Sequence, residues 1–410
     1  MTTRRSVIGG LAGLATFASL ATRPAVAAPG GEIPLFRRGI GVSHALGWAE
    51  VEADGSYGAA PFSGPRFRFD RAQRQAIRAA GFDFVRLAVD AGPFLAFTGV
   101  ARDRLDELLI GTVRDLIDAD LGVIVDLHPS AMNPAYRPAA LTGGVEAPKF
   151  RAVLALLRRL AGQLERLVQG GTARLALELM NEPERPQAAW QPMLEAAYRA
   201  ARSGSATLPL VLGGGSMNAP AALAAIDMRP FAGDPRLIYT YHDYSPWQFT
   251  HQGVRGNPAF SLDAIPYPAP SSAQAMIAAS QRRIGSLGLD GAALEQARAA
   301  KRTLARYAGF DRSALERTFL QVSAWRSAQR LPAHAVMLGE FGVHRTPYLA
   351  TAKGVAAREH WLRDMRELAE AHGFAWACWT YAGAGGFALA ENETGPGFDV
   401  ATRRALGLLP

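Results

Sequence analysis

Short apolar runs alternate with longer amphipathic segments through most of the chain. From about residue 38 onward, runs rich in Val, Ile and Leu have the length of buried strands, and segments of helical period separate them. These runs predict strands at 38–43, 83–89, 122–127, 174–180, 208–213, 236–241, 335–340 and 374–380. Helices are predicted at 71–80, 103–119, 148–168, 187–202 and 354–372, the first of them capped by Asp70 and ended by Gly81.

Strand–helix repeats with apolar strands predict a closed parallel barrel, because strands covered by helices on the outside and filled on the inside are buried on both faces. A doubly wound open sheet is the alternative. That fold normally carries a glycine-rich phosphate turn after its first strand. No such turn stands there, and Gly213-Gly214-Gly215 follows the fifth strand without opening a clear helix. We therefore expect an α/β protein with a (β/α)8 TIM barrel.

The connection between the sixth and seventh predicted strands is much longer than the others. It runs from 241 to 335, and we expect it to carry an insertion at about 245–330. Its first part, 245–270, is rich in proline and aromatic residues and predicts a loop over the barrel mouth, whereas 271–330 has helical period and predicts a small subdomain.

The first 28 residues are typical of a targeting segment. Arg4-Arg5 precedes an apolar stretch that leads to Ala25-Val26-Ala27, which resembles a twin-arginine export signal cleaved before Ala28. The apolar stretch is too short for a comfortable membrane span, and an uncleaved amphipathic anchor is the alternative. We expect export to the periplasm or the medium, no stable membrane insertion once the signal is removed, and a mature catalytic barrel at 29–410.

The composition narrows the class further. Of the 410 residues, 49% are hydrophobic and 20% are charged, which is typical of a globular protein. A single cysteine, Cys378, excludes an internal disulfide and any zinc or iron–sulfur site built from cysteines. The formal net charge is +8, but the arginines are scattered along the predicted helices, so we do not expect nucleic acid as a partner.

Polar residues stand where the predicted strands end, and the carboxyl ends of barrel strands form the active face. Glu182 and Glu340 follow strands four and seven, so both face the mouth. Two facing carboxyl groups are what glycoside hydrolysis needs, and a separation of roughly 5 Å suits a double-displacement route. For each glutamate alone, a strand-end salt bridge is the alternative. The full set of strand-end candidates is Arg86, His128, Asn181, Glu182, His242, Tyr244, Glu340 and Trp379.

The motifs around these residues resemble a known family. NEP after strand four, GEFG after strand seven, VRL on strand two, DLH after strand three, HDY after strand six and the tryptophan after strand eight are similar to glycoside hydrolase family 5. This is the cellulase-like group of clan A retaining glycosidases, and the resemblance covers about residues 38–390. It implies that Glu182 is the general acid/base and that Glu340 is the nucleophile of a covalent glycosyl-enzyme.

The same resemblance implies roles for the neighbouring side chains. Arg86 would keep Glu340 ionised, Tyr244 would orient it, and His242 would tune Glu182. Asn181 would hold the 2-hydroxyl of the sugar in subsite −1, His128 would contact that sugar and Trp379 would form the floor beneath it. Further residues that could line the cleft are His44, Trp48, Trp247, Phe249, Tyr381 and Phe387. Glu178 lies lower on strand four and is expected to be an interior charge partner.

The leading functional hypothesis is an exported endo-β-1,4-glucanase acting on a β-glucan or a bacterial exopolysaccharide. An exo-β-glucanase or a β-mannanase of the same family is the nearest alternative, and a glycan-binding protein on a decayed barrel is the alternative of another class. A metal-dependent barrel hydrolase would need an early H-x-H pair, and the sequence has none. We expect a monomer that binds a polysaccharide or oligosaccharide and uses no metal or other cofactor.

Overall fold

The computed structural model describes residues 35–168, 174–346, 348–383, 386–390 and 397–408. All of these belong to the compact unit Glu32–Pro410, and the expected export signal at 1–28 lies outside the described residues. Within the described ranges, the helices are all too short or too polar to cross a bilayer.

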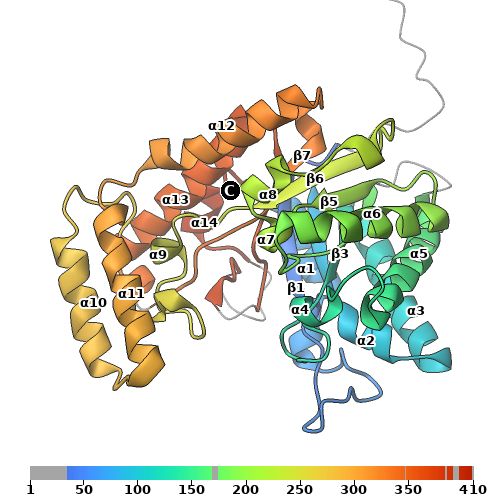
Figure 1. Cartoon of the computed structure of the whole chain (residues 1–410), viewed down its shortest axis with the longest axis horizontal. Helices are drawn as coiled ribbons and strands as arrows, with labels where there is room; N and C mark the ends of the chain where they lie inside the picture. Colours follow the sequence, from blue (N-terminus) through green and yellow to red (C-terminus); the bar gives the residue numbers. More distant parts are fainter. Residues whose placement is uncertain (1–34, 169–173, 347, 384–385, 391–396, 409–410) are drawn as a thin grey trace, which may run out of the picture. The chain divides into compact units, whose positions relative to one another are not determined.

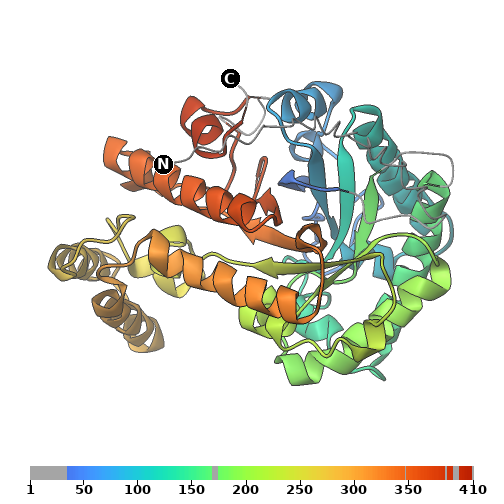
Figure 2. The same ribbon diagram turned by 90° about the horizontal axis from the view of Figure 1, so that it is seen from above.

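Eight parallel strands close into a barrel in the order of the sequence. Figure 2 shows strands in the middle of the molecule with helices around them. The fold class predicted from the sequence, a TIM barrel, is confirmed. The strands are β1 (Arg38–Leu46), β2 (Phe84–Asp90), β3 (Gly122–His128), β4 (Leu175–Glu178), β5 (Leu210–Gly213), β6 (Leu237–His242), β7 (Val336–Phe341) and β8 (Ala375–Cys378). Each lies within a few residues of its predicted position.

The barrel interior changes character from one end to the other. Near the amino ends of the strands it is filled by a small apolar cluster made of Phe36, Phe84, Ile124, Ala176, Val211, Ile238, Met337, Ala375 and Ala377. One step higher on β2, β3 and β4, Arg86, Asp126 and Glu178 take the inward positions, because side chains two apart share one face of a strand. The apolar layer therefore supports a buried polar layer, and the active face opens above it.

Helices surround the barrel. Their apolar side chains pack against the outward-facing side chains of the strands, and together these form the larger apolar core. The longer ones are α1 (Arg71–Ala79), α3 (Gly99–Asp118), α5 (Pro148–Val168), α6 (Gln187–Gly204), α12 (Arg312–Ala328) and α13 (Ala352–Ala371). Short helices stand in the connections: α2 (Ala91–Ala96), α4 (Pro138–Leu141) and α8 (Pro220–Ala224). The segment α7 (Gly215–Asn218) is a turn with left-handed backbone at Ser216 and Met217, and α14 (Val400–Ala405) follows β8. Asp70 caps α1 as expected, since its side chain accepts from the backbone N–H of Gln73.

The connection from β6 to β7 contains α9 (Trp247–Thr250), α10 (Gln274–Ser286), α11 (Gly291–Tyr307) and α12. Figures 1 and 2 show α10 and α11 side by side, away from the barrel strands, whereas α12 packs against α8 and α13 of the barrel shell. The helix pair is tied to the cleft wall, because Gln248 of α9 donates to Thr303 of α11 over 3.0 Å. The assignment of 245–330 as an insertion stays a prediction.

Candidate active site

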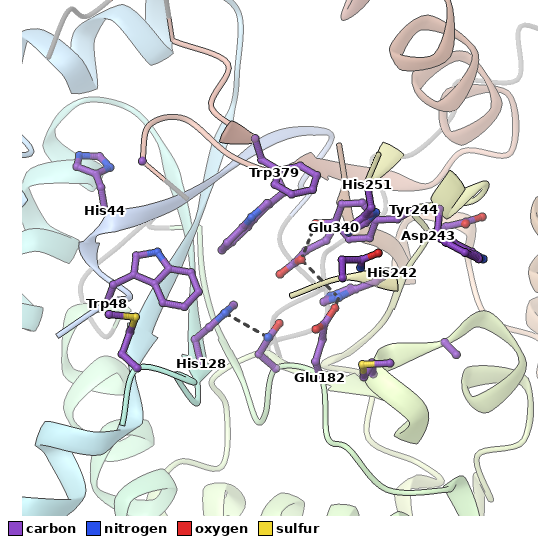
Figure 3. A pocket seen from close by; sticks show the side chains of 18 of the residues that line it. His44, Trp48, His128, Glu182, His242, Asp243, Tyr244, His251, Glu340 and Trp379 are labelled. Carbon is purple, nitrogen blue, oxygen red and sulfur yellow. Dashed lines mark hydrogen bonds and ion pairs between the residues drawn. The ribbon is translucent and has the colours of Figure 1, made fainter. Parts of the chain in front are cut away.

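A cleft with a volume of about 1170 Å³ opens at the carboxyl ends of the strands. Figure 3 shows its floor, with side chains that come from the carboxyl ends of barrel strands and from the loops that follow them. The strand-end candidates and weaker candidates that line it are His44, Trp48, His128, Asn181, Glu182, His242, Tyr244, Trp247, Glu340, Trp379 and Phe387. Among the strand-end candidates Arg86 is the exception, because it is fully buried beneath the floor.

Glu340 lies at the end of β7 with only 4% of its surface exposed. Its Oε1 accepts a hydrogen bond of 2.6 Å from Nη1 of Arg86, and its Oε2 accepts one of 2.9 Å from the hydroxyl of Tyr244. A cation and a phenol therefore stabilise the negative charge and fix the plane of this carboxylate.

Glu182 is held differently. It follows β4 in the left-handed backbone region, with φ of +44°, and 31% of its side chain is exposed to the cleft. Burial raises the pKa of Glu182 to about 6, and its Oε1 lies 2.8 Å from Nδ1 of His242. A carboxyl group with a raised pKa and access to the cleft is suited to give up a proton near neutral pH.

The two carboxyl groups meet as the sequence analysis expected. One oxygen of Glu182, one of Glu340 and a ring nitrogen of His242 all lie within 4.8 Å of one another, close to the carboxyl spacing of retaining glycosidases. Such a trio has the composition of a metal site. However, the guanidinium of Arg86 and the hydroxyl of Tyr244 already donate to both oxygens of Glu340, so a metal ion would have to displace donors and approach a buried cation.

Beneath the floor, one guanidinium holds three carboxylates. Arg86 donates to both oxygens of Glu178 over 2.7 and 2.8 Å and lies 3.1 Å from Asp126, in addition to its bond with Glu340. Burial raises the pKa of Glu178 to about 7 in spite of Arg86. Burial also works against the charge of Asp126, but Arg86 and His128 outweigh it and lower that pKa. Glu178 is thus the charge partner expected from its position on strand four.

Arg86 also orients the side-chain amide of Asn181. Its Nη2 donates to Oδ1 of Asn181 over 2.8 Å, which turns Nδ2 of Asn181 toward Nε2 of His128 at 3.3 Å. The other ring nitrogen of His128 lies 2.7 Å from Asp126. Burial alone would lower the pKa of His128, but the carboxylate of Asp126 outweighs it, so that the pKa is raised. Asn181 therefore presents an N–H donor at the floor of the cleft.

Trp379 forms an aromatic wall beside this amide. Its ring stacks on His128 with centroids 5.4 Å apart and an angle of 5° between the planes, and Trp48 meets the same imidazole edge-on at 5.6 Å. Gly41 of β1 makes the position of Trp379 possible, because a Cβ at that residue would lie 2.7 Å from Cε3 of the indole. Flat aromatic faces of this kind suit the C–H faces of sugar rings.

Two aromatic residues that could have lined the cleft lie elsewhere. Phe249 is fully buried and packs on Tyr267 at 5.7 Å, and Tyr381 is fully buried against Phe398 at 5.6 Å. Both side chains stabilise loops instead. His44 lines the cleft with 8% of its surface exposed, and burial lowers its pKa to about 4.

Sequence reasoning missed several residues at the site. Asp126 could have been found, because it stands two positions before His128 on the same strand face. Asn218 touches His242, and its only signal was the unexplained run of glycines before it. Met132 and Met217, more than half exposed at 54% and 56%, also line the cleft, and nothing in their surroundings in the sequence marks them.

A parallel barrel with two carboxyl groups facing each other over a sugar-sized cleft defines a retaining glycoside hydrolase. The family model described as "Cellulase (glycosyl hydrolase family 5)" matches residues 62–385. The chain therefore belongs to glycosyl hydrolase family 5, a retaining family of clan A, and the resemblance noted in the sequence is confirmed.

Curated relatives are distant. Endoglucanase 3 of Fibrobacter succinogenes is 24% identical over 223 residues, which are 53% of this chain and 31% of that protein. Endoglucanase C of Acetivibrio thermocellus is 27% identical over 196 residues, or 43% of this chain and 51% of that protein. The chain thus spans about a third of the length of the first relative and about half of the length of the second.

Solved structures share the fold over nearly the whole length. The cellulose synthase subunit Z of Clostridioides difficile has a TM-score of 0.63 at 21% identity, covering 90% of this chain and 99% of that one. Cel5A of Thermotoga maritima, solved with cellobiose, has a TM-score of 0.62 at 19% identity, covering 91% and 97%. A family 5 xyloglucanase from Paenibacillus pabuli has a TM-score of 0.64 at 15% identity, covering 91% and 98%.

Proposed function

We propose that this family 5 hydrolase is an exported endo-β-1,4-glucanase in which Glu340 is the nucleophile and Glu182 is the acid/base. Glu340 attacks the anomeric carbon while Glu182 gives its proton to the leaving oxygen. Water then releases the glycosyl-enzyme, with Glu182 accepting the proton. The observation that carries these roles is the unequal environment of the two carboxyl groups, one held by Arg86 and Tyr244 and the other partly exposed with a raised pKa.

The shape of the cleft favours cleavage inside a chain. Figure 3 shows His44 and Trp48 on one side of the carboxylate pair and Asp243 and His251 on the other, and all four line the cleft. Sugar units thus have room on both sides of the bond that is cut, as endo action requires. The curated relatives are endoglucanases, which supports a β-1,4-glucan over other glycans.

The substrate test is incubation of the purified protein with soluble β-1,4-glucan, mixed-linkage glucan, mannan and xylan, with product sizes resolved. Endo action on glucan is expected to lower the viscosity of the polymer early, when few reducing ends have formed. Release of a single small product from the first minutes would favour an exo-glucanase. A clear preference for mannan would identify the protein as a mannanase and contradict the proposed glucan substrate.

The catalytic roles are tested with Glu182→Gln and Glu340→Gln, with Glu184→Gln as the matched control. Glu184 is exposed and outside the cleft lining although it is only two residues from Glu182. Both cleft variants are expected to lose nearly all turnover of polymeric glucan and to keep the thermal midpoint within a few degrees, while the control retains activity. Near-normal hydrolysis by either cleft variant would refute its assigned role.

Export by the twin-arginine route is the last part of the proposal, and the supporting feature is the Arg4-Arg5 pair ahead of an apolar stretch and an A-x-A site. When the full chain is expressed, the cleaved protein is expected in the periplasm or medium, with Ala28 as its first residue. Replacement of both arginines by lysine should retain it in the cytosol. Unchanged export of the double variant would refute this route.

A further inference from the structure

The three glycines at the end of β5, Gly213 to Gly215, are each fitted to a close contact. A Cβ on Gly213 would lie 2.7 to 2.8 Å from the side-chain amide of Asn218, and one on Gly215 would lie 2.4 Å from the carbonyl of Arg185. The next three residues form a left-handed turn, with φ of +51° at Ser216, +59° at Met217 and +54° at Asn218. Non-glycine residues adopt this region at a cost, so surrounding contacts must hold the turn in place.

Those contacts come from the loop that carries Glu182. The backbone N–H of Ser216 donates to the carbonyl of Arg185 over 2.6 Å, and the N–H of Met217 donates to the carbonyl of Pro183 over 3.1 Å. The turn and the acid/base loop are therefore locked together, and the turn has one fully buried polar side chain, Asn218.

Asn218 aims its amide at His242. Nδ2 of Asn218 lies 3.3 Å from Nε2 of His242, and the other ring nitrogen, Nδ1, lies 2.8 Å from Oε1 of Glu182. Burial lowers the pKa of His242 to about 4, so the ring is neutral near pH 6 and carries one proton. An amide N–H that donates to Nε2 leaves the ring proton on Nδ1, where it points at Glu182.

We propose that Asn218 is a positioning residue for the acid/base, whose amide holds His242 in the Nδ1–H tautomer. This inference rests on the proposed role of Glu182. With Nδ1–H donating to Oε1, the proton of the acid must sit on Oε2, the oxygen that the imidazole does not occupy. From there it passes to the glycosidic oxygen as the C–O bond breaks toward that oxygen, and it is regained from water in the second step.

The opposite tautomer would disable the acid without moving it. If Nε2 carried the ring proton, Nδ1 would accept a hydrogen bond from Oε1–H, and the imidazole would hold the acidic proton away from the substrate. Asn218 thus selects which oxygen of Glu182 is acidic, although it contacts neither Glu182 nor the cleft.

Asn218→Asp tests this assignment, because aspartate has nearly the same size and also tolerates the left-handed backbone, but as a carboxylate it accepts a hydrogen bond where the amide donates one. General acid catalysis contributes about 10²- to 10⁴-fold, so we expect kcat/KM to fall by about 10- to 100-fold at pH 7 for phenyl β-cellobioside. A 2,4-dinitrophenyl leaving group needs little protonation, so its kcat/KM should change by less than about three-fold.

Asn133→Asp is the matched control. Asn133 is 2% exposed and donates to the carbonyl of Gly55, outside the cleft lining, so its loss should affect both substrates equally and weakly. Gly213→Ala is a second variant in case Asn218→Asp fails to fold, since the new methyl group should displace the Asn218 amide and reproduce the leaving-group pattern.

The tautomer itself is read by ¹⁵N NMR of histidine-labelled protein, with His242 assigned through His242→Gln. We expect Nδ1 to be protonated in the natural protein and Nε2 to be protonated in Asn218→Asp. An unchanged tautomer, or an equal loss with both aryl glycosides, would overturn the role of Asn218. If Glu182→Gln also lacks the leaving-group dependence, the proposed role of Glu182 fails; if Glu182→Gln shows it and Asn218→Asp does not, only the role of Asn218 fails.

Discussion

The raised pKa of Glu182 sets the alkaline side of the pH profile. Burial moves this pKa from 4.5 to about 6, which is a preference of about 2 kcal/mol for the protonated form. At pH 7 about 9% of the enzyme would then hold the acidic proton, against about 0.3% for an unshifted carboxyl group. The environment of Glu182 therefore increases the active fraction at neutral pH by about 30-fold.

The assay is kcat/KM for phenyl β-cellobioside between pH 4 and 9, because this parameter reports groups of the free enzyme. We expect the alkaline limb to fall with an apparent pKa near 6. The alkaline limb of the kcat profile should have a higher apparent pKa than that of kcat/KM. Bound substrate excludes water from the 31% of the Glu182 side chain that is exposed and so disfavours its charged form further.

Glu182→Gln provides the control, measured with a 2,4-dinitrophenyl leaving group that needs little acid help. Its profile for the first chemical step should lack the alkaline limb. A limb near pH 4.5 in the natural protein would show that burial does not raise this pKa. A limb that persists in Glu182→Gln would assign it to another group, such as His128 or Glu178, and would contradict the assignment to Glu182.

Three further outcomes follow from the buried contacts. Arg86→Met leaves three carboxylates without their cation and should lower the free energy of unfolding by about 3–5 kcal/mol in urea titrations at pH 7, whereas a loss below about 1 kcal/mol would mean that the carboxylates are already neutral. Gly41→Ala places a methyl group 2.7 Å from the Trp379 ring and should lower the free energy of unfolding by about 1–3 kcal/mol. It should also raise KM for cellotetraose and change the near-ultraviolet circular dichroism. An unchanged KM would argue against the indole as a sugar-binding surface. The pKa of His242 is lowered from 6.5 to about 4, so the stability it contributes is complete above pH 6.5 and is lost as the pH falls toward 4; His242→Gln should reduce the acid-induced loss of stability by up to about 3 kcal/mol, and parallel curves for the two proteins would contradict this.

The barrel could be predicted from the sequence because its signals are local. A strand buried on both faces needs an apolar run, and a surface helix needs an apolar stripe, so each element marks its own position. The ends of the strands were less certain. The predicted strand 174–180 stops at Glu178, although the backbone N–H groups of Leu179 and Asn181 still donate to carbonyls of the neighbouring strands. In the region where a small subdomain is predicted, 271–330, α12 contacts α8 and α13, whereas α10 and α11 contact each other, and the subdomain itself stays a prediction.

The active site was predictable where strand order alone brings residues together. Glu182 follows one strand of the barrel and Glu340 lies at the end of another, and parallel closure places all carboxyl ends on one face. Asn218 shows where this logic stops. It follows β5 by five residues, and a residue in a loop reaches the site only if the loop has a particular path. That path depends on Gly213, on Gly215 and on carbonyls beyond Glu182, and none of these contacts leaves a periodic trace in the sequence. A run of glycines whose φ values are ordinary, followed by residues whose φ values are positive, is a signature of packing and not of chain flexibility. This signature can be interpreted only from the structure, which shows which atom a Cβ at each glycine would contact.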